Sequence, residues 1–384
     1  MRNALLRIRG VITRGVITRG AITRGAIACA LLLVATSSHA AEVSGSGLTL
    51  GPADSKNVLI LHASNSVQVF KGVLEDFSQL NPDVRLEYTE LSTQQLYGDT
   101  IDRAQANPTA LQGPDLIISS AMDLQTKLVN DGYARVHVSP ETRALPAWAN
   151  WHDEVFSIGT DPIVMVYNTG KLAAARVPHT RRELLSLLQA PDQPRANSIS
   201  TYDVQGSGIG YLAATQDTRL DSMAGALLAA FGRNGVTIHE STEDALDKLE
   251  RGDVTLAYNL LESYTRHRID QGAPLAIIYP QDYTLMLSRS AIIPKQAPRA
   301  DLGARLLDYL LSPRGQEMLA KQSGMRRVNA SVVPAAGVRP MALGVGLLVY
   351  LDPLKKRHFL DLWRAAILPP GGSARPADPA ALPQ

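Results

Sequence analysis

The stretch 276–294, AIIYPQDYTLMLSRSAIIP, decides how we interpret the chain, because it holds two apolar runs separated by one polar elbow. Pro280 and Pro294 each end an apolar run, since proline can neither donate to a central ladder nor continue a helix. The polar residues 281–284 between the runs are typical of a turn. Two strands that flank an exposed turn suit a ligand contact at the mouth of a cleft, although an ordinary turn between core strands gives the same pattern.

The first 40 residues have the composition of a secretory signal peptide. They hold six arginines and no acidic residue, continue in an apolar run over 26–35, and end in Ser38-His39-Ala40. This order predicts cleavage after Ala40 and export to the periplasm, and the apolar run is too short for a stable membrane anchor. A five-residue repeat over 9–28 lengthens the basic region. A start site placed too far upstream is the alternative, and it leaves the same mature protein.

Charge and motif content exclude several classes of function. Without the six leader arginines, the 38 basic residues fall to 32 against 36 acidic ones, so the net charge becomes −4 and a nucleic-acid partner is not expected. The only cysteine, Cys29, lies in the leader, which leaves no disulfide and no thiol chemistry. The chain has no HExxH motif, no GxSxG around Ser207 and no metal-ligand spacing among its eight histidines. We therefore expect a binding protein without metal or cofactor; a secreted enzyme is the competing hypothesis.

Two segments repeat one pattern, in which serines separate an apolar strand from a helix. Strand 58–61 precedes Ser64-Asn65-Ser66 and a helix from 67, and strand 115–118 precedes Ser119-Ser120 and a helix through 124–129. Such serines would lie at the carboxyl edge of an open α/β sheet, where ligands bind. Helix capping alone explains either unit equally well.

The later half of the chain predicts a second group of strands and helices. Residues 163–168 form an apolar strand that we take as a crossing between two lobes, and strand 198–202 follows it. The glycine-rich turn at 205–208 fails the spacing of a dinucleotide fingerprint. It can still begin a helix that receives an anion, because glycine lets backbone approach a ligand closely.

The leader, the strand-serine-helix start, the strand MVYN at 165–168 and LLSPRGQ at 310–316 together resemble the periplasmic solute-binding proteins of ABC importers. The cluster that they resemble most groups ferric-ion binders with phosphoglycerate-type transport regulatory proteins. This resemblance implies an α/β fold of the type II periplasmic-binding-protein class, with two lobes that close on a ligand cleft and two crossing strands at 163–168 and 285–293. The expected division of the chain is a signal peptide at 1–40, lobe I at 55–161 plus 286–367, lobe II at 162–285 and a disordered tail at 368–384.

The resemblance also implies a ligand site and partners. Carried over by position, the ligand-facing candidates are Ser64, Asn65, Ser66, Ser119, Ser120, Ser207, Gly208, Tyr258, Asp282 and Tyr283. Ferric binders of this family use an adjacent tyrosine pair, which this chain lacks, although Tyr202, Tyr258, Tyr264 and Tyr283 could supply phenolates from separate loops. The hydroxyl pattern favours an organic or phosphorylated anion, with ferric iron as the alternative. The expected partners are permease subunits in the inner membrane, with a sensor histidine kinase as an alternative or additional partner, and the expected state is a monomer.

Overall fold

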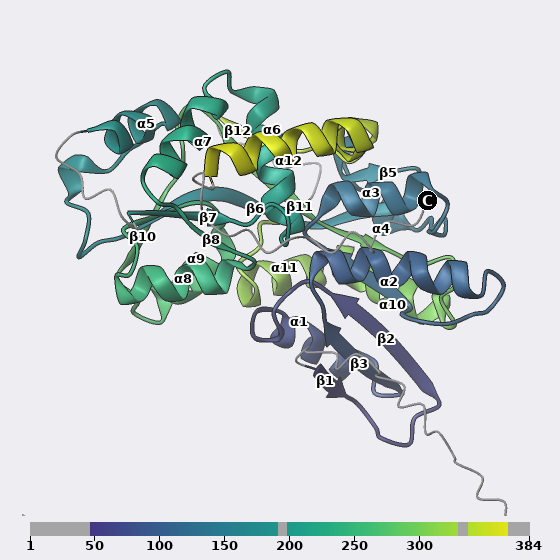
Figure 1. Cartoon of the computed structure of the whole chain (residues 1–384). Coiled ribbons are helices and arrows are strands. Elements are labelled where there is room, and N and C mark those ends of the chain that lie inside the picture. Colours follow the sequence, from purple (N-terminus) through teal and green to yellow (C-terminus); the bar gives the residue numbers. More distant parts are fainter. Residues whose placement is uncertain (1–46, 191–197, 329–336, 368–384) are drawn as a thin grey trace, which may run out of the picture. The chain divides into compact units, whose positions relative to one another are not determined.

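A mixed sheet of twelve strands runs through the part of the chain that the structure describes, residues 47–190, 198–328 and 337–367 (Figure 1). The structure is a computed structural model. Along the main path the strand order is β1-β3-β2-β4-β11-β6-β9-β7-β8. The predicted signal peptide and C-terminal tail lie outside the described residues. Within the described residues, no helix combines the length and apolar character that a membrane span requires.

The long strand β6 (Val155–Asn168) belongs to both halves of the sheet. Its first half pairs with β5 (Asn150–Trp151) and β11 (Thr284–Ile292), and its second half pairs with β9 (Leu256–Leu261) and β10 (Leu275–Ile278). It is buried along almost its whole length, which agrees with its nearly continuous apolar sequence. We call the strands and helices on its two sides the first and the second lobe. The predicted crossing at 163–168 is thus half of one longer strand.

The first lobe builds its sheet from parallel neighbours whose carboxyl ends meet at one edge. β2 pairs in parallel with β3 and β4, and α1, α2 and α3 follow these three strands directly. Apolar residues of α1 and α10, such as Phe70 and Leu306, are fully buried against the strands. The elements of this lobe besides β5 and β11 are β1 (Gly47–Leu50), β2 (Asn57–Ala63), α1 (Val67–Leu80), β3 (Val84–Glu90), α2 (Thr93–Ala106), β4 (Leu116–Ser119), α3 (Met122–Asn130), α4 (Pro140–Arg143), η1 (Ala147–Ala149), α10 (Ala300–Leu311), α11 (Pro313–Gln322) and β12 (Val338–Pro340).

The second lobe repeats the same arrangement with fewer strands. β7 pairs in parallel with β8 and β9, and a helix follows each of the three strands. The elements of this lobe besides β9 and β10 are η2 (Ala174–Arg176), α5 (Arg181–Gln189), β7 (Ile199–Tyr202), α6 (Gly208–Leu220), α7 (Ala224–Arg233), β8 (Thr237–His239), α8 (Thr242–Arg251) and α9 (Glu262–Asp270).

The elbow at 279–283 forms the second connection between the lobes. β10 before it pairs with the second half of β6, and β11 after it pairs with the first half. The two apolar runs of the sequence are therefore strands, as expected. The crossing lies in the elbow itself, however, and not within residues 285–293.

The C-terminal segment ends on the second lobe. It passes through η3 (Val345–Leu351), which contacts α3, and continues in α12 (Pro353–Ile367), which packs against α7 (Figure 1). Trp363 and Phe359 of α12 are buried in a cluster that contains Leu227 and Phe231 of α7. Placing residues 353–367 in the first lobe was therefore wrong for this helix, because its apolar face is covered by α7. The boundaries at 161/162 and 285/286 stay predictions.

Candidate functional site

The carboxyl ends of strands from both lobes border a cleft of about 550 Å³. The first lobe contributes the residues that follow β2, β3 and β4, and the second lobe contributes those that follow β7, β8 and β9. Open α/β sheets bind ligands at this edge, because side chains and helix N-termini gather where the strands end. The volume lies in the range of small-molecule sites.

Four of the predicted site residues line this cleft: Ser64, Ser66, Ser120 and Ser207. Ser64 accepts a hydrogen bond from the Ser120 backbone N–H at 3.0 Å, which joins the ends of β2 and β4. The Ser207 hydroxyl caps α6 by accepting from the Gly210 N–H at 3.2 Å. Ser66 differs from Ser207, because its hydroxyl makes no capping hydrogen bond to the helix α1 that follows it.

Three further predicted residues are buried beside the cleft and do not line it. Ser119 accepts from the Ala121 N–H at 3.2 Å, and the Gly208 N–H donates to Thr93 Oγ1 at 3.1 Å, from the second lobe to the first. The backbone carbonyl of Asn65 accepts a hydrogen bond from the Tyr88 hydroxyl. These residues hold the loops of the cleft in place.

Tyr258, Asp282 and Tyr283 lie in a separate cluster of the second lobe around the buried Arg181, which we call the Arg181 cluster; the two tyrosines are buried and Asp282 is exposed at its border. Arg181 donates to the Tyr258 hydroxyl at 2.7 Å and to Asp282 Oδ1 at 2.9 Å, and its guanidinium lies 3.6 Å from the centre of the Tyr283 ring. Asp217 accepts from the Tyr258 and Tyr283 hydroxyls at 2.8 and 2.7 Å. Assigning these three residues to the ligand site was therefore a misreading, because the protein itself satisfies their polar groups.

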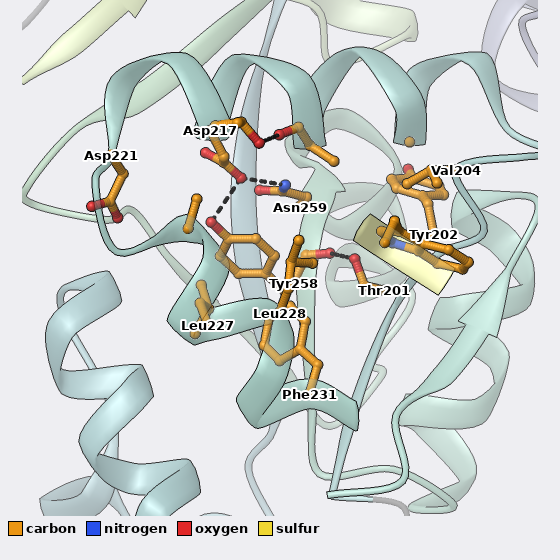
Figure 2. A pocket seen from close by; sticks show the side chains of 15 residues that line it. Thr201, Tyr202, Val204, Asp217, Asp221, Leu227, Leu228, Phe231, Tyr258 and Asn259 are labelled. Carbon is orange, nitrogen blue, oxygen red and sulfur yellow. Dashed lines mark hydrogen bonds between the residues drawn. The ribbon is translucent and has the colours of Figure 1, made fainter. Parts of the chain in front are cut away.

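Figure 2 shows the small cavity next to the Arg181 cluster; on its border the Tyr258 hydroxyl and the Asn259 amide both donate hydrogen bonds to Asp217. Its volume is about 30 Å³, and Trp363 of α12 contributes to its lining. That space suits one water molecule and is too small for a solute. The cleft of 550 Å³ remains the candidate ligand site.

Arg289 of β11 is a site residue that the sequence analysis overlooked. Its side chain is 1% exposed, lines the cleft, and forms an ion pair with the buried Asp161 at 3.4 Å. Its guanidinium lies 5.5 Å from the centre of the Tyr264 ring, and its Nε has no hydrogen-bond partner among the described residues. A buried donor without a partner costs about 1–3 kcal/mol. The signal was present in the sequence, since Ser288-Arg289-Ser290 interrupts an otherwise apolar strand.

The starts of two helices at the cleft already carry carboxylates of the protein. Glu90 accepts from the Val67 N–H at the start of α1 at 2.9 Å. Glu243 and Asp244 lie in the first turn of α8, and both line the cleft. Burial raises the pKa of Glu243, and the nearby charge of Glu90 adds to this effect. These carboxylates lie at helix N-termini, whose partial positive charge would otherwise attract an anionic ligand.

Tyrosines do not gather at the cleft. Of the four considered as phenolate donors, Tyr264 alone lines it, and its hydroxyl accepts from the Ser66 N–H at 3.1 Å. Burial raises the pKa of Tyr264 to about 12. Among the described residues, no group of three or more His, Cys, Asp or Glu side chains is placed to hold a metal ion.

The strand order and the interlobe cleft define the class of type II periplasmic binding proteins, and comparison with known proteins agrees. Residues 73–340 match the model of the bacterial extracellular solute-binding protein family, so the chain belongs to this family. A substrate-binding protein of an ABC transporter from Agrobacterium tumefaciens is similar over 84% of this chain and 98% of that chain, with 28% identity and a TM-score of 0.79. No curated protein sequence matches the chain.

Two more distant structures share the fold. They are AfuA from Actinobacillus pleuropneumoniae with bound fructose-6-phosphate, at 17% identity and a TM-score of 0.67, and iron-bound HitA from Pseudomonas aeruginosa, at 15% identity and a TM-score of 0.62. The chain covers 99% of each of them, and they cover 82% and 81% of this chain. The expected two-lobed fold is confirmed, and so is the role of a solute-binding protein of ABC transport.

Proposed function

We propose that the protein captures a small organic solute with an anionic group in the periplasm and delivers it to the permease subunits of an ABC importer. The observation that carries this proposal is Arg289, a fully buried arginine on the cleft whose Nε lacks a partner among the described residues. A guanidinium matches the planar geometry of carboxylate, phosphate and sulfonate groups. The hydroxyls of Ser66 and Ser120 can add hydrogen bonds to the same group.

Ferric iron is the alternative ligand, and the cleft supports it less well. Iron-bound HitA shares the fold. At 15% sequence identity, this similarity concerns the fold alone and not the ligand. Tyr264 is the single tyrosine among the described residues that line the cleft, so an adjacent pair of phenolates is not formed there. Contact with a sensor histidine kinase and a monomeric state stay predictions from the family resemblance.

A thermal-shift screen of the secreted protein tests the proposal. The panel contains di- and tricarboxylates, phosphorylated three-carbon acids, sulfonates and ferric citrate. A ligand at one hundred times its dissociation constant stabilises the folded state by about 2.7 kcal/mol, which moves the melting temperature by a few degrees. We expect at least one organic anion to produce this shift. A shift with ferric citrate alone, together with a tyrosinate absorption band, would contradict the proposal.

A further inference from the structure

The two lobes contact each other directly at the border of the cleft. The backbone N–H of Gly208, the first residue of α6 in the second lobe, donates at 3.1 Å to Thr93 Oγ1 at the start of α2 in the first lobe. The Ser66 N–H of the first lobe donates at 3.1 Å to the Tyr264 hydroxyl of the second lobe. Thr93, Ser66 and Tyr264 all line the cleft. Because protein groups form both sides of these bonds, the lobes can close without a ligand that bridges them.

Gly208 has no room for a side chain at this contact. A Cβ atom added to it would lie 2.5 Å from Thr93 Oγ1 and 3.0 Å from the Ala121 Cβ. Both atoms belong to the first lobe, one on α2 and one at the start of α3. The Thr93 hydroxyl can rotate away, whereas the Ala121 Cβ is fixed to the backbone, and two carbon atoms in contact need about 3.5–4.0 Å. Even a methyl group at position 208 would therefore hold the two lobes apart.

A second glycine of α6 differs from Gly208 in what surrounds it. A Cβ atom added to Gly210 would lie 2.3 Å from the Tyr202 Cβ, which belongs to β7 of the same lobe. Gly210 thus allows close packing inside the second lobe, whereas Gly208 allows the close approach of the first lobe. Ser207 and Ile209, the neighbours of Gly208 in the chain, line the cleft. The separation of the lobes at Gly208 therefore affects the width of the cleft directly.

We propose that the two lobes close directly on each other at Gly208, and that the absence of a side chain there sets the width of the closed cleft and the length of the solute that both lobes can contact. This inference rests on the proposed function only in taking the cleft as the solute site. A side chain at position 208 would stop closure earlier. The cleft would then fit a longer solute and lose contacts with the solute that fits the wild type.

Distances between two spin labels, one in each lobe, measure closure of the free protein. Residues 41–384 contain no cysteine, so Glu75→Cys on α1 and Arg251→Cys on α8 supply the attachment points, and both side chains are solvent-exposed. We expect double electron–electron resonance to find a closed distance in the free wild type. Gly208→Leu should abolish it, and Gly208→Ala should lengthen it. Gly225→Leu is the control and should keep the wild-type distance, since nothing lies within 4 Å of a Cβ atom added there.

Thermal stability distinguishes a stop between lobes from ordinary packing. Gly208→Ala should melt close to the wild-type temperature, because the methyl group fits once the lobes are apart. Gly210→Ala should melt several degrees lower, because the Tyr202 Cβ lies in the same lobe and cannot move away with the other lobe. Its closed distance should nevertheless equal that of the wild type. The melting curves also establish which variants are folded.

Dicarboxylates of increasing length, from malonate to pimelate, test the consequence for the solute by calorimetric titration. The acid that binds the wild type most tightly should bind Gly208→Ala about tenfold or more weakly, because the solute loses hydrogen bonds to one lobe. A longer acid should become the preferred ligand of Gly208→Ala. Gly225→Ala should keep the wild-type preference.

The outcomes separate this inference from the proposed function. Long distances alone in the free wild type would overturn the inference, and so would the same closed distance in wild type and Gly208→Leu. The same preferred acid with the same affinity in wild type and Gly208→Ala would also overturn it. The distances are measured without a ligand, so they decide the inference even if ferric citrate alone shifts the melting curve and the proposed function fails.

Discussion

At the scale of single residues, two buried arginines serve different purposes because their charges are compensated to different degrees. Arg181 has two carboxylates within reach, Asp282 at 2.9 Å and Asp217 at 3.2 Å. Arg289 has Asp161 alone, at 3.4 Å. The charge of Arg181 is therefore the more fully compensated of the two, which favours a role in stabilising the second lobe, whereas Arg289 is the arginine that we propose as the ligand anchor.

Replacing Arg181 should destabilise the protein, because Arg181 lies outside the proposed ligand site and compensates buried charge. Arg181→Met leaves the buried carboxylate of Asp217 without its ion pair, and breaking a buried pair in this way costs about 3–5 kcal/mol. The measurement is the free energy of unfolding in a denaturant titration. Arg251→Met is the control: its ion pair with Asp253 is solvent-exposed, so the expected change is below about 1 kcal/mol. Unchanged stability with lost ligand binding in Arg181→Met would return the Arg181 cluster to the ligand site.

The predicted site residues fall into two groups. Some are predicted by a pattern that spans a few residues, and the environment of the others depends on residues far away in the sequence. Three serines between a strand and a helix, Ser64, Ser66 and Ser120, line the cleft in the structure, and the pattern that singles them out spans only a few residues of the chain. Tyr258 and Asp282 were misassigned, since the residue that engages them, Arg181, is 77 and 101 positions away in the sequence. A turn pattern carries no information about such a distant partner.

At the scale of elements, the contact between α7 and α12 is close enough to exclude a single methyl group. A Cβ atom added at Gly232 would lie 1.8 Å from the Ala366 carbonyl oxygen. That oxygen belongs to the backbone of α12 and cannot turn aside as a side chain would. The glycine therefore sets how closely the C-terminal helix approaches the second lobe.

Gly232→Ala should displace α12 and lower the free energy of unfolding by about 1–3 kcal/mol, even though alanine favours a helix. Gly225→Ala on the same helix is the control, since nothing lies within 4 Å of the added Cβ. We expect this control to be neutral or stabilising by up to about 1 kcal/mol. Denaturant titration of the two variants side by side makes the comparison, and equal effects would show that the close approach does not hold α12.

Helices whose apolar residues recur at a regular spacing could be predicted from the sequence, and helices without such a spacing could not. The apolar spacing from Val67 to Phe77 predicted α1, whose buried face is almost entirely apolar. Helix α2 was missed because two of its three buried residues, Thr93 and Thr100, are polar and leave no apolar stripe to recognise. This gap also concealed Thr93, which lines the cleft.

At the scale of the whole molecule, the chain passes between the lobes more often than the sequence suggested. β6 contains the first expected connection, and the second lies in the elbow at 279–283, just before the expected strand 285–293. The C-terminal segment adds another, since η3 contacts α3 of the first lobe and α12 packs on α7 of the second. The apolar stripe of α12 predicts a helix but not its partner, which is why its lobe could not be assigned from the sequence.

The central claim is that Arg289 anchors the solute where the two lobes meet, and calorimetric titration of Arg289→Lys tests it most directly. Lysine keeps the charge beside Asp161 but loses the planar fork that binds an anionic group. The titrant is the ligand that gives the largest thermal shift. Arg314→Lys is the control, since Arg314 pairs with Asp76 outside the cleft. We predict binding that is about tenfold or more weaker in Arg289→Lys and unchanged in Arg314→Lys. Wild-type affinity in a folded Arg289→Lys protein would contradict the account.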